Sequence, residues 1–300
     1  MSLLDAIGNT PLIRLKDINI KLEYLNPSGS VKDRIAKYII EKAERTSQIK
    51  PGYTVIEATS GNTGIAFSMV CALKGYKMVA VMPRGLSSER VAMMRAFGAK
   101  VIFVEDNCFT CAIKRTEELG KKPKTFLPKQ FANHLNVEEH EKNLGQEILK
   151  QVKKVDAFVA GVGTGGTLIG VGRALSKEFQ DVKLFAIEPD ECAMLASSGI
   201  GKVYDRAKVH SICRRHRIEG IGDGIIPSII SKHKGMIDGI IEIRSKDALE
   251  MSGKLAKQGY LVGPSSGANL LGALKLRKKY ENVVTLFPDR GERYLSEHIF

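Results

Sequence analysis

An α/β fold, in which parallel sheets are covered by helices, is the class that this sequence predicts. Short runs of β-branched and apolar residues alternate with helical patterns along nearly the whole of its 300 residues. That alternation is typical of strand–helix–strand units, whose strands pair in parallel. Several runs, such as Phe158–Ala160, are apolar without a polar residue at every second position, which indicates strands buried on both faces.

The strands are expected at Ile20–Tyr24, Thr54–Ala58, Lys77–Met82, Val101–Glu105, Ala157–Ala160, Leu184–Ile187, Ile240–Ile243 and Val283–Phe287. Helices are expected between them, near 32–48, 62–74, 87–97, 110–119, 137–152, 166–178, 246–258 and 266–280. The sequence has no internal repeat and no low-complexity linker. The segment 190–219 is its least regular part, and we expect it to form a surface excursion.

The composition narrows the classes of function. The chain carries 46 basic and 33 acidic residues, a net charge of +13, but the basic residues are spread along it and it has no Trp. Nucleic acid is therefore a poor candidate ligand, because single-strand binding relies on aromatic residues among basic ones. We find no apolar run long enough to span a bilayer and no signal peptide in the first residues, so a cytoplasmic protein is expected.

The five cysteines are expected to be reduced thiols in that compartment. Cys108 and Cys111 form a C-x-x-C pair after a predicted strand, as redox pairs can. A zinc site is a second hypothesis, with candidate ligands Cys192, His210, Cys213 and His216. Both hypotheses are weaker than the alternative that these are ordinary surface residues, and no metal is expected.

Lys32 stands at the first turn of a predicted helix, after the cap-like lead-in Pro27-Ser28-Gly29-Ser30. A helix N-terminus disfavours positive charge and so favours the neutral amine, which a Schiff base with a carbonyl cofactor requires. A lysine on a helix is more often a solvated charge, so the local sequence alone leaves both interpretations open.

The loop Thr59-Ser60-Gly61-Asn62-Thr63-Gly64 joins the strand Thr54–Ala58 to the next helix. Its backbone N–H groups and small hydroxyls are suited to binding a carboxylate. The carboxyl end of a strand is also where open α/β sheets bind ligands. Simple helix capping by Ser60 or Asn62 is the alternative interpretation.

A second loop, Gly161-Val162-Gly163-Thr164-Gly165-Gly166-Thr167, also follows a strand and opens a helix, as phosphate-binding loops do. It satisfies the pattern G-x-G-x-x-G, and Glu188 lies about twenty residues further on. An oxidoreductase that uses a nicotinamide dinucleotide is therefore a rival interpretation. The hydroxyls of Thr164 and Thr167 favour a phosphate monoester instead.

The segment Pro264-Ser265-Ser266-Gly267-Ala268-Asn269 first suggests one more helix start. If a pyridine cofactor is present, a neutral hydroxyl facing its ring nitrogen would leave that nitrogen unprotonated and the ring a weaker electron sink. Elimination at a β-carbon would still proceed, whereas full carbanion chemistry such as transamination would be restrained.

These motifs together resemble the cysteine synthase (O-acetylserine sulfhydrylase) family, which also includes the catalytic core of cystathionine β-synthase. The resemblance covers essentially the whole chain, from Ile7–Leu12 to Pro288–Leu295. It implies pyridoxal 5′-phosphate as cofactor and two doubly wound parallel-sheet domains of the fold-type II, tryptophan synthase β-like architecture. Residues 1–34 and 136–300 would form the large cofactor-binding domain, and residues 35–135 a small mobile domain with the substrate-carboxylate loop.

The resemblance also implies roles for single residues. Lys32 would be the Schiff-base lysine, Asn62 would bond to the phenolic oxygen of the cofactor, and Ser265 would face its pyridine nitrogen. The phosphate would be held by Gly163, Thr164, Gly165, Gly166 and Thr167. The substrate carboxylate would be held by Thr59, Ser60, Gly61, Thr63 and Gln130.

The implied reaction is a two-stage β-replacement. An amino acid such as O-acetyl-L-serine displaces Lys32, which then removes the α-proton, and the β-group leaves. Sulfide or a thiol adds to the resulting aminoacrylate, and sulfide gives L-cysteine. Asp223 departs from the commonest pattern of the family; our hypothesis is that it faces the leaving group and activates water or a second amino acid. A turn cap is the alternative.

We therefore expect a cytoplasmic, homodimeric cysteine synthase, with a serine acetyltransferase-type protein as candidate partner. Alternatives in the same class are a cysteine-consuming enzyme that releases H2S and forms lanthionine, cystathionine or serine, and a synthase with a nitrogen nucleophile. From other classes, an NAD-dependent oxidoreductase would leave Lys32 and Thr59–Gly64 unexplained, and a non-catalytic scaffold would leave the cofactor contacts unused. The sequence does not choose the leaving group or the nucleophile.

Overall fold

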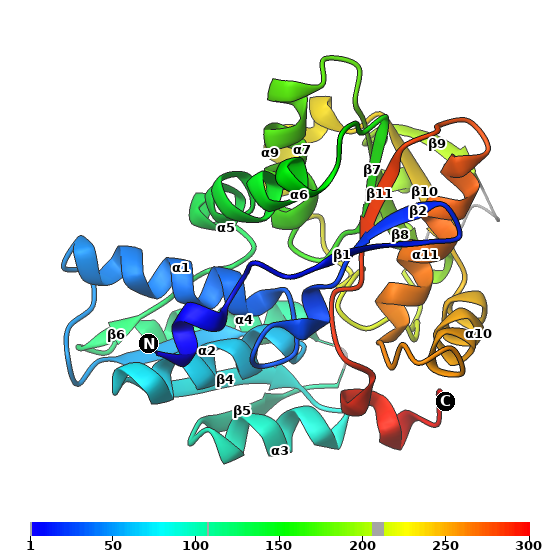
Figure 1. The fold of residues 1–300 in the computed structure, drawn as a ribbon. Helices are drawn as coiled ribbons and strands as arrows, with labels where there is room; N and C mark the ends of the chain where they lie inside the picture. Colours follow the sequence, from blue (N-terminus) through cyan, green and yellow to red (C-terminus); the bar gives the residue numbers. More distant parts are fainter. Residues whose placement is uncertain (1, 107, 206–212) are drawn as a thin grey trace.

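The computed structural model describes residues 2–106, 108–205 and 213–300, which form two sheets covered by helices (Figure 1). The strand orders are β1-β2-β11-β7-β8-β10-β9 in the larger sheet and β5-β4-β3-β6 in the smaller. Strands β1 and β2 pair antiparallel, and the other pairs are parallel. The predicted α/β class with two parallel sheets is confirmed.

The larger sheet consists of β1 (Leu12–Leu15), β2 (Ile18–Lys21), β7 (Ala157–Gly161), β8 (Lys183–Pro189), β9 (Lys202–Asp205), β10 (Gly239–Ile243) and β11 (Val283–Leu286). The smaller sheet consists of β3 (Thr54–Ala58), β4 (Lys77–Pro83), β5 (Lys100–Val104) and β6 (Thr125–Phe126). All four strands of the smaller sheet fall within residues 35–135. The domain boundaries at 34 and 135 stay a prediction.

The helices are α1 (Lys32–Arg45), α2 (Asn62–Lys74), α3 (Ser88–Ala96), α4 (Phe109–Gly120), α5 (His134–Glu139), α6 (Gly145–Gln151), α7 (Gly166–Glu178), α8 (Met194–Ser197), α9 (Ser228–His233), α10 (Ser245–Ala256) and α11 (Pro264–Arg277). A π-helical turn, His140–Leu144, joins α5 to α6. Short 3-10 turns lie at Leu3–Ala6, Glu23–Leu25, Asp190–Cys192, Lys234–Met236 and Gly291–Glu297. No helix of the described ranges is both long and apolar enough to cross a membrane.

Apolar side chains fill both faces of each sheet. In the larger sheet, one cluster packs α5, α6 and α7 against the strands, and a second packs α10 and α11 against the opposite face. In the smaller sheet, α1, α2 and α3 cover one face and α4 covers the other. This layering buries the central strands on both sides, which explains their unbroken apolar runs.

Two expectations need correction. The segment 190–219 is more than a surface excursion, because β9 pairs with β10 at the edge of the larger sheet. The cysteines are not all reduced: Cys108 pairs with Cys111, and Cys192 with Cys213. The second pair forms because the fold brings together residues 21 positions apart, with their Cα atoms separated by 4.0 Å, which spacing alone does not reveal.

Candidate active site

A cavity of about 50 Å³ brings residues of the separate motifs together. Predicted site residues in its lining are Lys32, Ser60, Asn62, Thr63, Gln130, Gly163, Thr164, Gly165, Thr167, Asp223 and Ser265. The other three predicted residues, Thr59, Gly61 and Gly166, do not line it. The convergence places the carboxyl ends of β3 and β7 and the starts of α1, α2, α7 and α11 around one space.

Lys32 is the first residue of α1, and its amine faces the cavity. Burial lowers the pKa of this amine, while the nearby Asp223 and Asp289 carboxylates oppose the shift. Because burial is the larger effect, the neutral form is favoured, in agreement with the argument from the helix start. A neutral amine is the form that can attack a carbonyl.

Buried ion pairs fix the turn that carries this lysine. Arg34, two residues further along α1, donates to Glu23 at 2.6 Å and to Glu147 at 2.7 Å. Asp33 accepts the backbone N–H of Ser28 at 2.6 Å. These contacts fasten the start of α1 to the 3-10 turn after β2 and to α6, so the lysine has a defined place.

The loop after β3 is held by one of its own side chains. The Thr59 hydroxyl oxygen is fully buried and accepts the backbone N–H groups of Gly61 and Gly64, at 2.9 and 3.0 Å. Gly61 has φ of +146°, and a Cβ there would lie 2.1 Å from Arg90. Thr59 therefore shapes the loop from within, whereas Ser60 and Thr63 present their side chains to the cavity.

Gln130 is a buried support for the same loop. It accepts the Thr63 hydroxyl at 2.7 Å, and its amide nitrogen donates to the Ala58 carbonyl at 2.8 Å. Its backbone N–H donates to the buried Glu57 carboxyl at 3.2 Å. The prediction that grouped Gln130 with the Thr59–Gly64 loop therefore agrees in position, while its role toward a substrate stays a prediction.

Asn62 is fixed by residues near the C-terminus that we did not single out from the sequence. Its amide nitrogen donates to Asp289 at 2.7 Å, and its oxygen accepts from Arg293. Asp289 also accepts the Tyr294 hydroxyl. One N–H of the Asn62 amide is left to face the cavity. These contacts could not be read from the sequence, because the fold brings residues 289–294 back to the start of α2.

The loop before α7 requires glycine at several places. Gly165 has φ of +84°, a conformation that other residues rarely adopt. A Cβ on Gly163 would lie 2.4 Å from the Gly220 carbonyl oxygen, and one on Gly166 would lie 1.9 Å from the Asn136 side-chain oxygen. The loop is packed too closely for side chains, and the first-turn N–H groups of α7 are available to an anion.

Two buried residues of the helix after the smaller sheet hold the threonines of this loop. Asn136 donates to the Thr164 hydroxyl oxygen at 3.0 Å and to the Gln130 carbonyl at 2.9 Å. His140 lies 2.7 Å from the Asn136 carbonyl through Nδ1 and 3.0 Å from the Thr167 hydroxyl through Nε2. Neither residue was predicted, because an Asn and a His on a helix carry no signal of their own.

The proton positions in this network differ for the two threonines. Burial lowers the pKa of His140 to about 3, so the ring is neutral. Its Nδ1 donates to a carbonyl, so its Nε2 must accept the Thr167 hydroxyl proton. Thr164 receives a donor, so its own proton is free to point into the cavity. In this arrangement the Thr167 hydroxyl proton is directed to His140, and the role of both threonines toward a phosphate stays a prediction.

Ser265 lies in the first turn of α11, which also starts at the cavity, and it is almost fully buried. Asn269, one turn later, accepts the Gly161 N–H at 2.8 Å and donates to the Leu286 carbonyl at 2.9 Å. These bonds tie α11 to the ends of β7 and β11. Ser265 thereby lines the same cavity as the glycine-rich loop.

Asp223 also lines the cavity. Burial raises the pKa of its carboxyl, and the charges of His216, Lys32 and Arg90 oppose the rise. A carboxyl in this setting, beside an amine, can exchange protons with a bound molecule. Its catalytic role stays a prediction.

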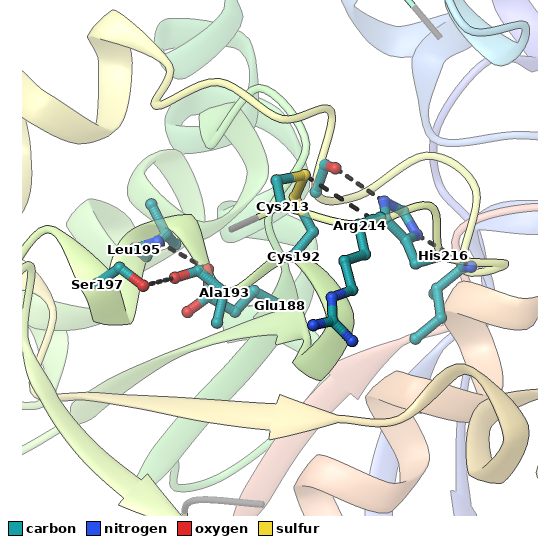
Figure 2. Close-up of a disulfide and its surroundings, with 10 residues drawn as sticks. Glu188, Cys192, Ala193, Leu195, Ser197, Cys213, Arg214 and His216 are labelled. Carbon is teal, nitrogen blue, oxygen red and sulfur yellow. Dashed lines mark hydrogen bonds between the residues drawn. A yellow bond between two sulfur atoms is a disulfide. The ribbon is translucent and has the colours of Figure 1, made fainter. Parts of the chain in front are cut away.

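The rival interpretations fit the structure less well. The Glu188 carboxylate, which would have to bind a ribose, instead accepts the backbone N–H of Leu195 at 2.7 Å (Figure 2) and that of Ala196 at 2.9 Å. The zinc hypothesis is weakened because Cys192 and Cys213 are joined to each other. His210, the remaining histidine of that hypothesis besides His216, lies outside the described residues.

The cavity fits pyridoxal phosphate on structural grounds. The glycine loop packs closely on Gly220, Ile230 and Asn136 and lines the cavity at the start of α7, where Thr164 has a hydroxyl proton to donate. Lys32 supplies an amine whose pKa is lowered by burial in the same cavity, and Ser265 a neutral hydroxyl. Residues 3–289 match the family described as pyridoxal-phosphate dependent enzyme. The chain belongs to this family.

Individual relatives agree along nearly the full length. The chain is 43% identical to cysteine synthase of Staphylococcus aureus, over 98% of this chain and 95% of that protein. The structure of the O-acetylserine dependent cystathionine β-synthase from Helicobacter pylori superposes with a TM-score of 0.91 at 36% identity, covering 100% of this chain and 98% of that one. A hydrogen sulfide-producing enzyme of Fusobacterium nucleatum gives a TM-score of 0.89 at 39% identity, covering 99% and 90%. The protein is thus an enzyme with pyridoxal phosphate as its cofactor, and its fold is that of the fold-type II members.

Proposed function

We propose that the enzyme forms L-cysteine from O-acetyl-L-serine, or a similar β-activated serine, and sulfide. The observation that carries this proposal is the meeting of the Lys32 amine, two anion-binding helix starts and the Ser265 hydroxyl in one cavity. One helix start suits a phosphate and the other a substrate carboxylate. The identity of 43% to a cysteine synthase over almost the whole chain supports the same activity.

The residues divide the work as follows. The N–H groups of Gly163–Thr167 and the Thr164 hydroxyl would hold the phosphate, Asn62 would bind the phenolic oxygen, and Ser265 would face the pyridine nitrogen. The pyridoxal ring supplies an electron sink when bound. The substrate carboxylate is bound by the loop Thr59–Thr63 with Gln130. The Lys32 amine, whose pKa is lowered by burial, takes the proton from the substrate α-carbon so that the β-group can leave.

The proposal has a dynamic and an assembly part. Residues 35–135 carry the carboxylate loop, and we propose that they close on the substrate and exclude water. A homodimer, a cytoplasmic location and an acetyltransferase-type partner complete the proposal and follow from the family resemblance. Gel filtration with light scattering tests the dimer directly.

A second candidate activity uses the same cavity. Asp223 lies among the lining residues close enough to Lys32 for their charges to interact. Its carboxyl can take a proton from water or from a second amino acid, which supports β-replacement on L-cysteine with release of H2S. The hydrogen sulfide-producing relative agrees with this activity.

A product assay separates the two activities. The enzyme is given O-acetyl-L-serine with sulfide, or L-cysteine alone, and cysteine, serine, lanthionine and sulfide are quantified. We expect faster turnover of O-acetylserine. Asp223→Ala should reduce sulfide release from cysteine by roughly 100-fold, as loss of a general base does, while cysteine formation falls less. An equal loss in both reactions would contradict the assigned role.

A further inference from the structure

A second cavity of about 560 Å³ adjoins the active-site cavity. The two share Ser60, Gly220, Ile221 and Asp223 in their linings. Asp223 therefore stands at the junction, and a molecule in the second cavity, hereafter the vestibule, has direct access to the reacting centre. The vestibule is far larger than a sulfide ion requires.

The vestibule wall is basic. It contains the consecutive residues Arg214, Arg215, His216 and Arg217. The carboxylates in the same wall are Glu219, Glu297 and Asp223. Glu219 is already paired with the buried Arg90, so its charge is compensated inside the protein. Arginine is the side chain best suited to bind a carboxylate, because its planar guanidinium forms two parallel hydrogen bonds.

The basic segment is anchored to the body of the protein. The disulfide between Cys213 and Cys192 fastens its beginning (Figure 2). The Arg214 N–H also donates to the Glu191 carbonyl at 2.8 Å. His216 meets the Gly222 carbonyl at 2.8 Å. The arginines thus start from a fixed backbone, which lowers the entropy lost when they bind a ligand.

The three arginines are not equivalent. The Arg217 guanidinium donates to the backbone carbonyl of Glu297 at 2.8 Å, and its backbone N–H donates to the Ser245 hydroxyl at 2.9 Å. Arg217 therefore has a structural task. Arg214 and Arg215 are exposed, and among the described residues no side-chain partner of their guanidinium groups is found. They are the pair available to a ligand.

We infer that the vestibule binds the carboxylate of a second substrate, a thiol acid larger than sulfide, through Arg214 and Arg215. The inference rests on the proposed β-replacement and adds the residues that select a thiol nucleophile by its carboxylate. The carboxylate loop at Thr59–Thr63 is taken by the first amino acid, so a second carboxylate needs another cationic site. Size and charge of the vestibule meet that need.

The reaction balances without another reactant. The bond between the β-carbon of O-acetylserine and the acetyl oxygen breaks, and acetate leaves with the bonding electrons. The thiol sulfur supplies the electron pair of the new C–S bond and loses its proton, for which Asp223 at the junction is the nearest carboxylate of the shared lining. The products are a thioether amino acid, acetate and a proton.

The test compares two thiols that differ only in charge, 3-mercaptopropionate and 3-mercaptopropionamide, with O-acetylserine as first substrate. We expect kcat/KM to be roughly tenfold higher for the carboxylate, from two partly exposed ion pairs. The ratio should fall toward one in the double variant Arg214→Gln/Arg215→Gln and at high salt. The control is Arg115→Gln. Arg115 pairs with Glu118 on α4 and does not line the vestibule, so the ratio of the two kcat/KM values should be unchanged.

Turnover with sulfide is measured on every preparation to separate the two levels of the argument. If wild-type enzyme fails with sulfide and with both thiols, the proposed function is overturned. If it turns over sulfide but shows equal kcat/KM for the two thiols, or keeps its preference in the double variant, the vestibule assignment is overturned.

Discussion

The two anion-binding loops of this enzyme, Gly163–Thr167 before α7 and Thr59–Gly64 before α2, occupy the same position in their sheets but are held differently. The first is held from outside, by Asn136 and His140 on a neighbouring helix. The second is shaped from inside by the Thr59 hydroxyl, although Gln130, Asp289 and Arg293 also contact its residues Thr63 and Asn62. An external support suits a permanently bound phosphate, whereas the internal bonds of Thr59 would persist if residues 35–135 move.

The strongest test of this comparison is Thr59→Val, which keeps the shape of the side chain but removes the acceptor. Two buried N–H groups, of Gly61 and Gly64, would then lack a partner, and each such loss costs about 1–3 kcal/mol. We expect kcat/KM for O-acetylserine to fall roughly 100-fold. The affinity for pyridoxal phosphate, measured by fluorescence titration, should change little; a matching loss of cofactor affinity would show that the loops are not independent.

The converse change is Asn136→Ala, which removes the outer support of the phosphate loop. We expect the dissociation constant of the cofactor to rise by roughly tenfold or more, because Thr164 and the Gln130 carbonyl both lose a buried donor. Asn133→Ala is the matched control, since Asn133 caps the start of α5 at the Leu135 N–H and touches neither threonine. Equal effects of the two variants would mean that only helix stability matters.

A finer test compares Thr164→Val with Thr167→Val. The proton arrangement predicts that Thr164 donates its hydroxyl proton to the phosphate, whereas Thr167 donates its hydroxyl proton to His140 Nε2. Thr164→Val should weaken cofactor binding by about 1–2 kcal/mol and shift the 31P resonance of the bound phosphate. Thr167→Val should lower thermal stability and leave that resonance in place. The reverse pattern would refute the assignment of the protons.

The last prediction concerns the pH dependence of stability rather than activity or cofactor binding. Burial raises the pKa of Glu57, below the Thr59–Gly64 loop, to about 8, above its ordinary value of 4.5. The folded protein therefore keeps a proton that the unfolded chain loses, so stability falls as pH rises from about 4.5 to about 8. Glu57→Gln should flatten this dependence by at most about 1.4 kcal/mol per pH unit in urea unfolding. His140, whose pKa burial lowers from 6.5 to about 3, contributes a slope of the opposite sign between those two values, and this slope is the same in wild type and Glu57→Gln.

Sequence patterns predicted the features that depend on local chemistry. The bounds of α2 and α7 follow from the loops that open them, and the helix predicted at 137–152 is present but interrupted by a π-helical turn that no pattern announced. The predicted strand Ile20–Tyr24 ends at Lys21, because Glu23 begins a 3-10 turn and pairs with Arg34.

What the sequence could not provide were contacts between distant parts of the chain. The supports of Asn62 lie more than 200 positions away, at Asp289 and Arg293. The Cys192–Cys213 bond and the vestibule that it borders depend on the path of a segment with little regular structure. Asn136 on α5 and His140 in the following π-helical turn reach Thr164 and Thr167 only because this segment packs on α7.

The most direct test of the central claim is the visible absorption spectrum of the purified protein as O-acetyl-L-serine and L-cysteine are added separately. The account predicts a yellow protein whose spectrum changes with O-acetylserine as acetate is released, and whose colour is lost in Lys32→Ala. A change with cysteine and release of sulfide, with no response to O-acetylserine, would instead make cysteine consumption the main activity. A protein that stays colourless after pyridoxal phosphate is supplied would contradict the cofactor assignment on which the account rests.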